Sequence, residues 1–105
     1  MQLEQKLIMI TGGGQGLGRA MALRLAEQGA RLALVDMNPD HLAETCELVA
    51  QAGSSAQGYV CNVSDEAAVV QTVKDIAASQ GTISGLVNNA GITRDGLLLK
   101  AKDGV

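Results

Sequence analysis

The residues best suited to chemistry form a glycine-rich segment near the start of the chain, where residues 11–18 read TGGGQGLG. An apolar run, residues 7–10, precedes this segment, and a stretch with helical periodicity follows it. Glycine lets the backbone approach a ligand closely and adopt positive φ. Amides at the start of a helix attract anions such as a pyrophosphate. The segment therefore predicts an anion-binding loop, with a flexible glycine turn that binds nothing as the alternative.

The spacing of the glycines distinguishes between kinds of nucleotide loop. A GxxxxGK[ST] loop counted from Gly13 reaches Gly18, but Arg19 and Ala20 then stand where Lys and Ser or Thr are needed. A GxGxxG pattern counted from Gly12 would place its third glycine on residue 17, which is a leucine. The pattern that fits is GxxxGxG, through Gly12, residue 16 and Gly18.

Asp36 is the second informative residue. It ends the apolar segment 31–36, close to where an acidic side chain accepts hydrogen bonds from an adenosine ribose in dinucleotide-binding proteins. A carboxylate there repels a 2′-phosphate, and no Lys or Arg lies between Arg31 and Asp40 to attract one. These residues favour NAD over NADP. The alternative is that Asp36 is a solvated turn residue.

The segments that would position these residues alternate between strand and helix. Strand-like apolar segments are expected at residues 7–10, 31–36, 57–61 and 85–87. Helical segments are expected at residues 17–28, with Leu17, Met21 and Leu25 on one apolar face, from Asn38-Pro39 to Gly53, and from a Ser64 cap to Gly81. Strands separated by helices pair in parallel through right-handed crossovers. We predict one α/β domain over residues 1–105, an open doubly wound sheet.

Composition and charge exclude several classes of protein. The 105 residues are 47% hydrophobic and 18% charged, which argues against a disordered chain. Eight basic and 11 acidic residues leave a net charge of −3, so no basic surface for nucleic acid is expected. Cys46 and Cys61 are too few for a metal site or a disulfide framework, and we expect both to be buried thiols. No apolar run is long enough for a membrane span. We expect a cytoplasmic protein without a metal.

Two motifs together resemble the short-chain dehydrogenase/reductase family: TGGGQGLG, and NNAG at residues 88–91. Residues 88–98 are most similar to the 3-oxoacyl-(acyl-carrier-protein) reductases of that family, which act in fatty acid biosynthesis. The resemblance covers essentially the whole chain. It implies a Rossmann-like sheet with strand order 3-2-1-4 that lacks the C-terminal half of the family fold.

The resemblance also implies which residues contact the cofactor. Loop residues would hold its phosphates, Asp36 the adenosine ribose, the residues after the third strand the adenine, and those after the fourth strand the nicotinamide-side ribose. The set is Gly12, Gly14, Gln15, Gly16, Leu17, Gly18, Asp36, Asn62, Val63, Asn89, Ala90 and Gly91. Asn88 and Asn89 are also expected to tie neighbouring strands together through backbone hydrogen bonds.

The chain departs from the family at the catalytic residues. The family uses a Ser, an Asn and a Tyr-x-x-x-Lys pair downstream of the matched region, whereas the single tyrosine here, Tyr59, is followed four residues later by Val63. No catalytic residue is therefore assigned. We expect the cofactor-binding half of an NAD(P)-dependent oxidoreductase, inactive by itself, which in the intact enzyme reduces a 3-oxoacyl thioester or a similar carbonyl and forms a homo-oligomer. The alternatives are a non-catalytic NAD-binding module and, less favoured because of the motif at residues 88–91, a methyltransferase.

Overall fold

A computed structural model describes residues 3–89 of the chain. Within them, strands and helices alternate without exception. The strands are β1 (Leu7–Thr11), β2 (Arg31–Asp36), β3 (Ala56–Val60) and β4 (Ile83–Asn88). The helices are α1 (Gly16–Glu27), α2 (Pro39–Gln51) and α3 (Glu66–Gln80). The predicted alternation is confirmed.

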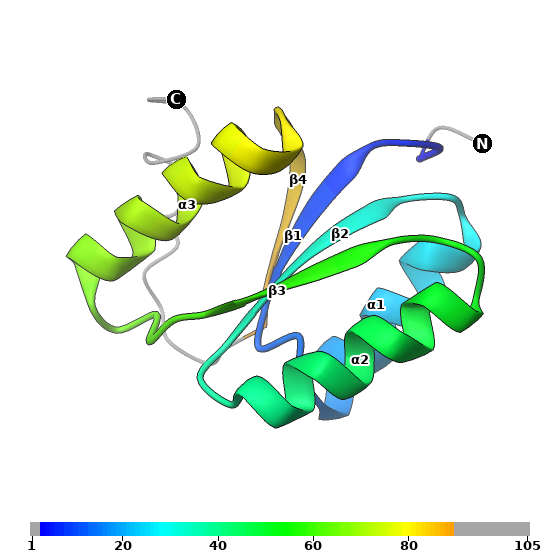
Figure 1. Ribbon diagram of the computed structural model, residues 1–105, viewed down its shortest axis with the longest axis horizontal. Helices are drawn as coiled ribbons and strands as arrows, with labels where there is room; N and C mark the ends of the chain where they lie inside the picture. The colour runs from blue at the N-terminus through cyan, green and yellow to red at the C-terminus, as the bar shows by residue number, and fades with distance from the viewer. Residues whose placement is uncertain (1–2, 90–105) are drawn as a thin grey trace.

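The strands form one parallel sheet in the order β3-β2-β1-β4, as predicted (Figure 1). At its centre, Ile10 of β1 pairs with Leu34 of β2 on one side and with Val87 of β4 on the other. Because all four strands are parallel, their carboxyl ends lie at the same edge of the sheet, with β1 between β2 and β4. The segments that follow these strands are therefore brought together.

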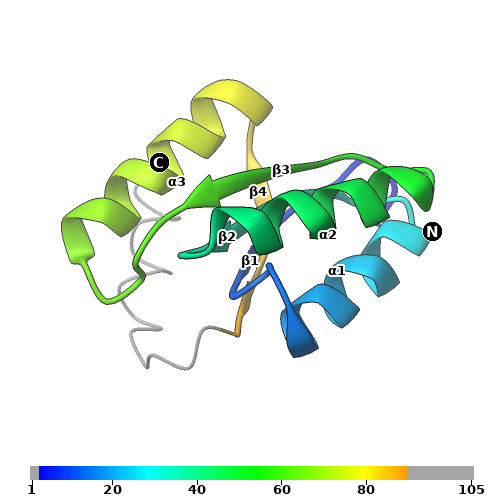
Figure 2. The same cartoon turned by 60° about the horizontal axis from the view of Figure 1, so that its bottom comes forward.

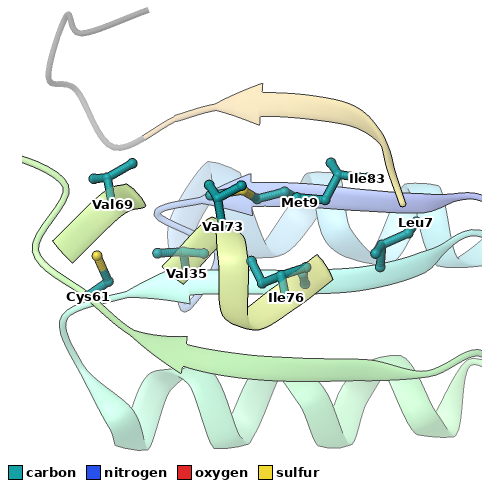
Figure 3. Close-up of a cluster of buried hydrophobic side chains, with 9 residues drawn as sticks. Leu7, Met9, Val35, Cys61, Val69, Val73, Ile76 and Ile83 are labelled. Carbon is teal, nitrogen blue, oxygen red and sulfur yellow. The ribbon is translucent and has the colours of Figure 1, made fainter. Parts of the chain in front are cut away.

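Alternate side chains of the strands point to opposite faces of the sheet and form two buried clusters. Figures 1 and 2 show α3 on one face and α1 and α2 on the other. On the α3 face, Val73 and Ile76 pack against Met9 and other strand residues (Figure 3). Burial of an aliphatic side chain of this size contributes about 1.5–3 kcal/mol. These contacts fix the helices on both faces of the sheet.

The buried face of α1 differs from the one that its leucine spacing predicted. The helix buries Gly18, Ala22 and Ala26, whereas Leu17 is 66% exposed. The cause is steric: α1 starts so close to the end of β1 that only small side chains fit between helix and sheet. Among the larger apolar residues of α1, Leu23 and Leu25 are only partly buried against the buried cluster on the α1 face of the sheet.

The helix starts confirm one predicted cap and correct another. The side chain of Asn38 accepts hydrogen bonds from the backbone N–H groups of Asp40 and His41, at 2.9 and 3.0 Å, as a cap of α2 should. At α3 the cap is Asp65, not the predicted Ser64. Ser64 instead donates its hydroxyl and its backbone N–H to Asn62, so its side chain is already engaged in the preceding turn.

The two cysteines differ in how deeply they are buried. Cys61 is buried beside α3, as expected, whereas Cys46 on α2 is only partly buried, and burial raises the pKa of its thiol. Within residues 3–89, no group of three or more His, Cys, Asp or Glu side chains could hold a metal ion. None of the helices there combines the length and apolar character that a membrane crossing requires.

Candidate functional site

A cleft of about 480 Å³ opens at the carboxyl ends of the four strands. Most of the residues predicted to contact a cofactor lie around it: Gly12, Gln15, Gly16, Asp36, Asn62, Val63 and Asn89. Segments far apart in the sequence thus contribute to one surface. Ala90 and Gly91, also predicted, lie outside the described residues.

The glycine loop adopts a backbone that its sequence anticipates. Gly12 and Gly16 have φ angles of 68° and 60°, in the left-handed region that other residues rarely adopt. The N–H groups of Gly12 and Gly13 both donate to the carbonyl oxygen of Val35, at 2.7 and 3.1 Å. The loop is therefore tied to β2, and its position relative to Asp36 is set by backbone hydrogen bonds.

Helix α1 begins directly against this loop. A Cβ atom on Gly18 would overlap the carbonyl oxygen of Gly12 and lie 3.0 Å from the side-chain nitrogen of Asn89. The residue before the helix, Gln15, provides no side-chain cap, and the first turn contains no acidic residue. The first-turn amides therefore have no capping side chain, and the helix dipole favours an anion at this end.

Asp36 is held firmly at the edge of the cleft. Its Oδ2 atom accepts the N–H of Gly14 at 2.9 Å, and its Oδ1 atom accepts the N–H groups of Met37 and Asn38 at 2.7 and 3.3 Å. Three backbone donors thus orient this carboxylate toward the loop. Two of the three donors belong to the turn that follows β2, and the third, the N–H of Gly14, ties the carboxylate to the glycine loop.

Asn88, which ends β4, and Asn89, which follows it, are joined to β1 through a side chain that sequence reasoning did not assign to the site. The buried hydroxyl of Thr11 lies 2.9 Å from Oδ1 of Asn88 and accepts the N–H of Asn89, also at 2.9 Å. The expected link between strands is therefore present, but a threonine side chain makes it. Its signal in the sequence is a hydroxyl residue at the last position of an apolar strand.

The residues after β3 form the far side of the cleft. Oδ1 of Asn62 accepts the N–H and the hydroxyl of Ser64 at 3.0 and 2.7 Å, which makes a compact turn. Ser64, Met37 and Cys61 also line the cleft and were not predicted to do so. They are ordinary residue types, and only the convergence of strand ends brings them here.

The comparisons with known proteins agree with this geometry. The family model described as short chain dehydrogenase matches residues 6–104. The chain is 39% identical to 2,3-dihydro-2,3-dihydroxybenzoate dehydrogenase of Bacillus subtilis, over 96% of its own length and 39% of the relative's. It is 40% identical to the 3-oxoacyl-(acyl-carrier-protein) reductase of Vibrio harveyi, over 98% of its length and 41% of the relative's.

Solved structures show the same similarity. A crystal structure of NAD⁺-bound xylitol dehydrogenase superposes with a TM-score of 0.84 and 41% identity, over 88% of this chain and 35% of the other. The parallel sheet and its helices form a Rossmann-like α/β fold with a cleft at the strand ends. The chain belongs to the short-chain dehydrogenase family, and it spans about 40% of the length of the curated relatives that it matches.

The contact between Gly18 and Gly12 makes a prediction for stability. Gly18→Ala should lower the free energy of unfolding by about 3 kcal/mol or more, because backbone that cannot move aside opposes the new methyl group. The control is Gly85→Ala, whose Cβ would meet only the flexible end of Ile8 at 2.9 Å and should cost about 1 kcal/mol. Urea unfolding followed by circular dichroism measures both, and equal losses would contradict the prediction.

Proposed function

We propose that these residues form the NAD-binding part of a longer oxidoreductase, in which hydride passes between NAD(H) and a carbonyl or alcohol substrate. The observation that carries this proposal is the carboxylate of Asp36, held at the cleft edge by the N–H of Gly14. A fixed negative charge at the end of the second strand suits ribose hydroxyls, which donate hydrogen bonds to it, and opposes a 2′-phosphate.

The residues around the cleft fit such a dinucleotide. The open first turn of α1 and the glycine loop would hold the pyrophosphate, because a backbone without Cβ atoms lets the phosphates approach the amides. Asn62 and Val63 would lie against the adenine, and Asn89 with Ala90 and Gly91 along the nicotinamide-side ribose. The bound nicotinamide supplies the hydride chemistry, while the protein positions it.

The substrate proposed for the whole protein is a 3-oxoacyl thioester or a similar carbonyl compound. Its support is the similarity to the Vibrio harveyi reductase over nearly the whole chain. The described residues provide no acid of the family's kind, because the hydroxyl of Tyr59 lies away from the cleft. It lies 3.0 Å from the hydroxyl of Ser79 and accepts a hydrogen bond from the side chain of Gln80 at 2.7 Å. Proton transfer would thus fall to residues other than these.

A non-catalytic NAD-binding module is the second candidate function. The 105 residues contain no Tyr-x-x-x-Lys pair, so they do not by themselves distinguish this module from the oxidoreductase. The coding sequence beyond residue 105 distinguishes the two candidates. A downstream Ser together with a Tyr-x-x-x-Lys pair supports the oxidoreductase, and their absence supports the binding module.

The preference for NAD can be measured directly. Calorimetric titration should show NAD⁺ binding at least about tenfold more tightly than NADP⁺, a difference of about 1.4 kcal/mol. Asp36→Ala should narrow this ratio, since it removes the charge that opposes the 2′-phosphate. Asp40→Ala, which removes an exposed carboxylate from the first turn of α2, is the matched control and should leave the ratio unchanged. Equal affinities in the unmodified protein would contradict the proposal.

Activity provides a separate prediction. The 105 residues alone should bind NADH but not oxidise it in the presence of an acetoacetyl thioester, because no Tyr-Lys pair is present to deliver the proton. Absorbance at the reduced-nicotinamide band, followed with and without the thioester, makes the measurement. Turnover that depends on the thioester would contradict the assignment of catalysis to residues outside this chain.

We also propose that the chain associates with a second copy of itself. Among the described strands, β4 pairs only with β1, so its outer edge is open. Beside it lies a mostly apolar groove of about 330 Å³, lined by Leu17, Ala20, Met21, Leu25 and Val87 and by the charged Arg24. Unpaired strand edges next to apolar surface favour association.

Light scattering tests this association. The purified chain should have a mass above that of the monomer, and Leu17→Lys should shift it toward the monomer. Met37→Lys, a change of the same kind at a residue that is 63% exposed beyond the end of β2, should not. A monodisperse monomer at high protein concentration would contradict the proposal.

A further inference from the structure

Arg19 of α1 joins the glycine loop to α2 through a group of hydrogen bonds. Its Nε atom donates to the hydroxyl of Thr45 at 2.9 Å, and its Nη2 atom donates to the carbonyl oxygen of Gly14 at 2.7 Å. The hydroxyl of Thr45 lies 2.8 Å from the same carbonyl oxygen. Two side chains from two helices thus converge on one peptide of the loop.

The direction of these bonds is determined by chemistry. A guanidinium only donates and a carbonyl oxygen only accepts, so the hydroxyl of Thr45 must accept from Arg19 and donate to Gly14. Both lone pairs of the Gly14 oxygen are then occupied. Thr45 is fully buried, so loss of its hydroxyl cannot be replaced readily by water.

Asp36, the carboxylate proposed to favour NAD over NADP, is bound by the other backbone polar group of Gly14. The N–H of Gly14 donates to Oδ2 of Asp36 at 2.9 Å. A Cβ on Gly14 would lie 2.7 Å from that oxygen and 2.9 Å from Cβ of His41, so the contact permits only glycine. Gly14 therefore connects Asp36, through its N–H and carbonyl groups, to Arg19 and Thr45.

The ion pair of Arg19 does not explain this arrangement. Arg19 also donates to Oε1 of Glu44 at 2.9 Å, but the side chain of Glu44 is 62% exposed. Pairs of this kind contribute little to stability in water. The part-buried bonds of Arg19 to Thr45 and Gly14, together with the buried bond from Thr45 to Gly14, are the ones that connect the loop to the two helices.

We propose that Arg19 and Thr45 are positioning residues that set the dinucleotide preference of the cleft by holding the carbonyl group of Gly14, and with it the residue whose N–H binds Asp36. The inference rests on the proposed function, that the cleft binds NAD. Neither residue is assigned a contact with the cofactor. Their effect passes through the Cα of Gly14, which joins the peptide whose carbonyl Arg19 and Thr45 hold to the peptide whose N–H donates to Asp36.

The test compares Thr45→Val with Thr45→Ser. Valine has nearly the shape of threonine but cannot donate, whereas serine keeps the hydroxyl. Thr72→Val, the same change at a buried threonine of α3, is the matched control, and Glu44→Gln removes only the exposed charge. Each variant is examined by amide hydrogen exchange at Gly14 and by calorimetric titration with NAD⁺ and NADP⁺.

In Thr45→Val we expect the Gly14 amide to exchange at least about tenfold faster, and the preference for NAD⁺ to fall at least threefold. Arg19→Gln should act in the same direction, which provides a second variant if valine prevents folding. Thr45→Ser, Thr72→Val and Glu44→Gln should resemble the unmodified protein in both measurements.

The outcomes separate the two proposals. If the unmodified protein prefers NAD⁺ and both Thr45→Val and Arg19→Gln retain that preference, this inference is overturned and the proposed function stands. If the unmodified protein binds neither dinucleotide, the proposed function fails, and the claim about preference fails with it. The exchange rate at Gly14 still reports whether Arg19 and Thr45 hold the loop, because that measurement needs no ligand.

Discussion

The structure depends on one close contact, between the first turn of α1 and the end of β1. Gly18 lies so near the carbonyl oxygen of Gly12 that no side chain fits there. Because the helix is this close, Ala22 and Ala26 form its buried face and the larger Leu17 is displaced into solvent. The same closeness places the open amino end of α1 beside the cleft, where the helix dipole favours an anion. The same steric contact thus determines both the packing of α1 and the position of its amino end at the cleft.

The order of the strands places this contact beside the other residues that line the cleft. With β1 between β2 and β4, the loop after β1 meets Asp36 on one side and Asn89 on the other. Part-buried hydrogen bonds hold these segments together: the hydroxyl of Thr11 accepts the N–H of Asn89, and the N–H of Gly14 donates to Asp36. The positions of the residues around the cleft therefore depend on backbone hydrogen bonds as well as on side chains.

Local signals predicted the elements and most of the cleft, because strand-helix alternation and the glycine spacing are readable within a few residues. They failed where the position of a side chain depends on contacts with other parts of the fold. The face of α1 was predicted wrongly from its leucine spacing, since the distance to the sheet, not the period, selects small residues. Ser64 resembles a cap, but its hydroxyl is engaged by Asn62, so Asp65 caps α3. The link from Arg19 to Thr45 has no local signal at all.

The central claim is that a dinucleotide lies across the strand ends, with its phosphates on the glycine loop and its adenosine ribose on Asp36. Titration of the isotope-labelled chain with NAD⁺, followed by two-dimensional NMR, tests it most directly. We expect the backbone amides of Gly12, Gly16 and Met37 to shift together and to saturate at one concentration, while that of Gln51 at the far end of α2 stays unchanged. Shifts confined to α2, or none at the glycine loop, would contradict the account.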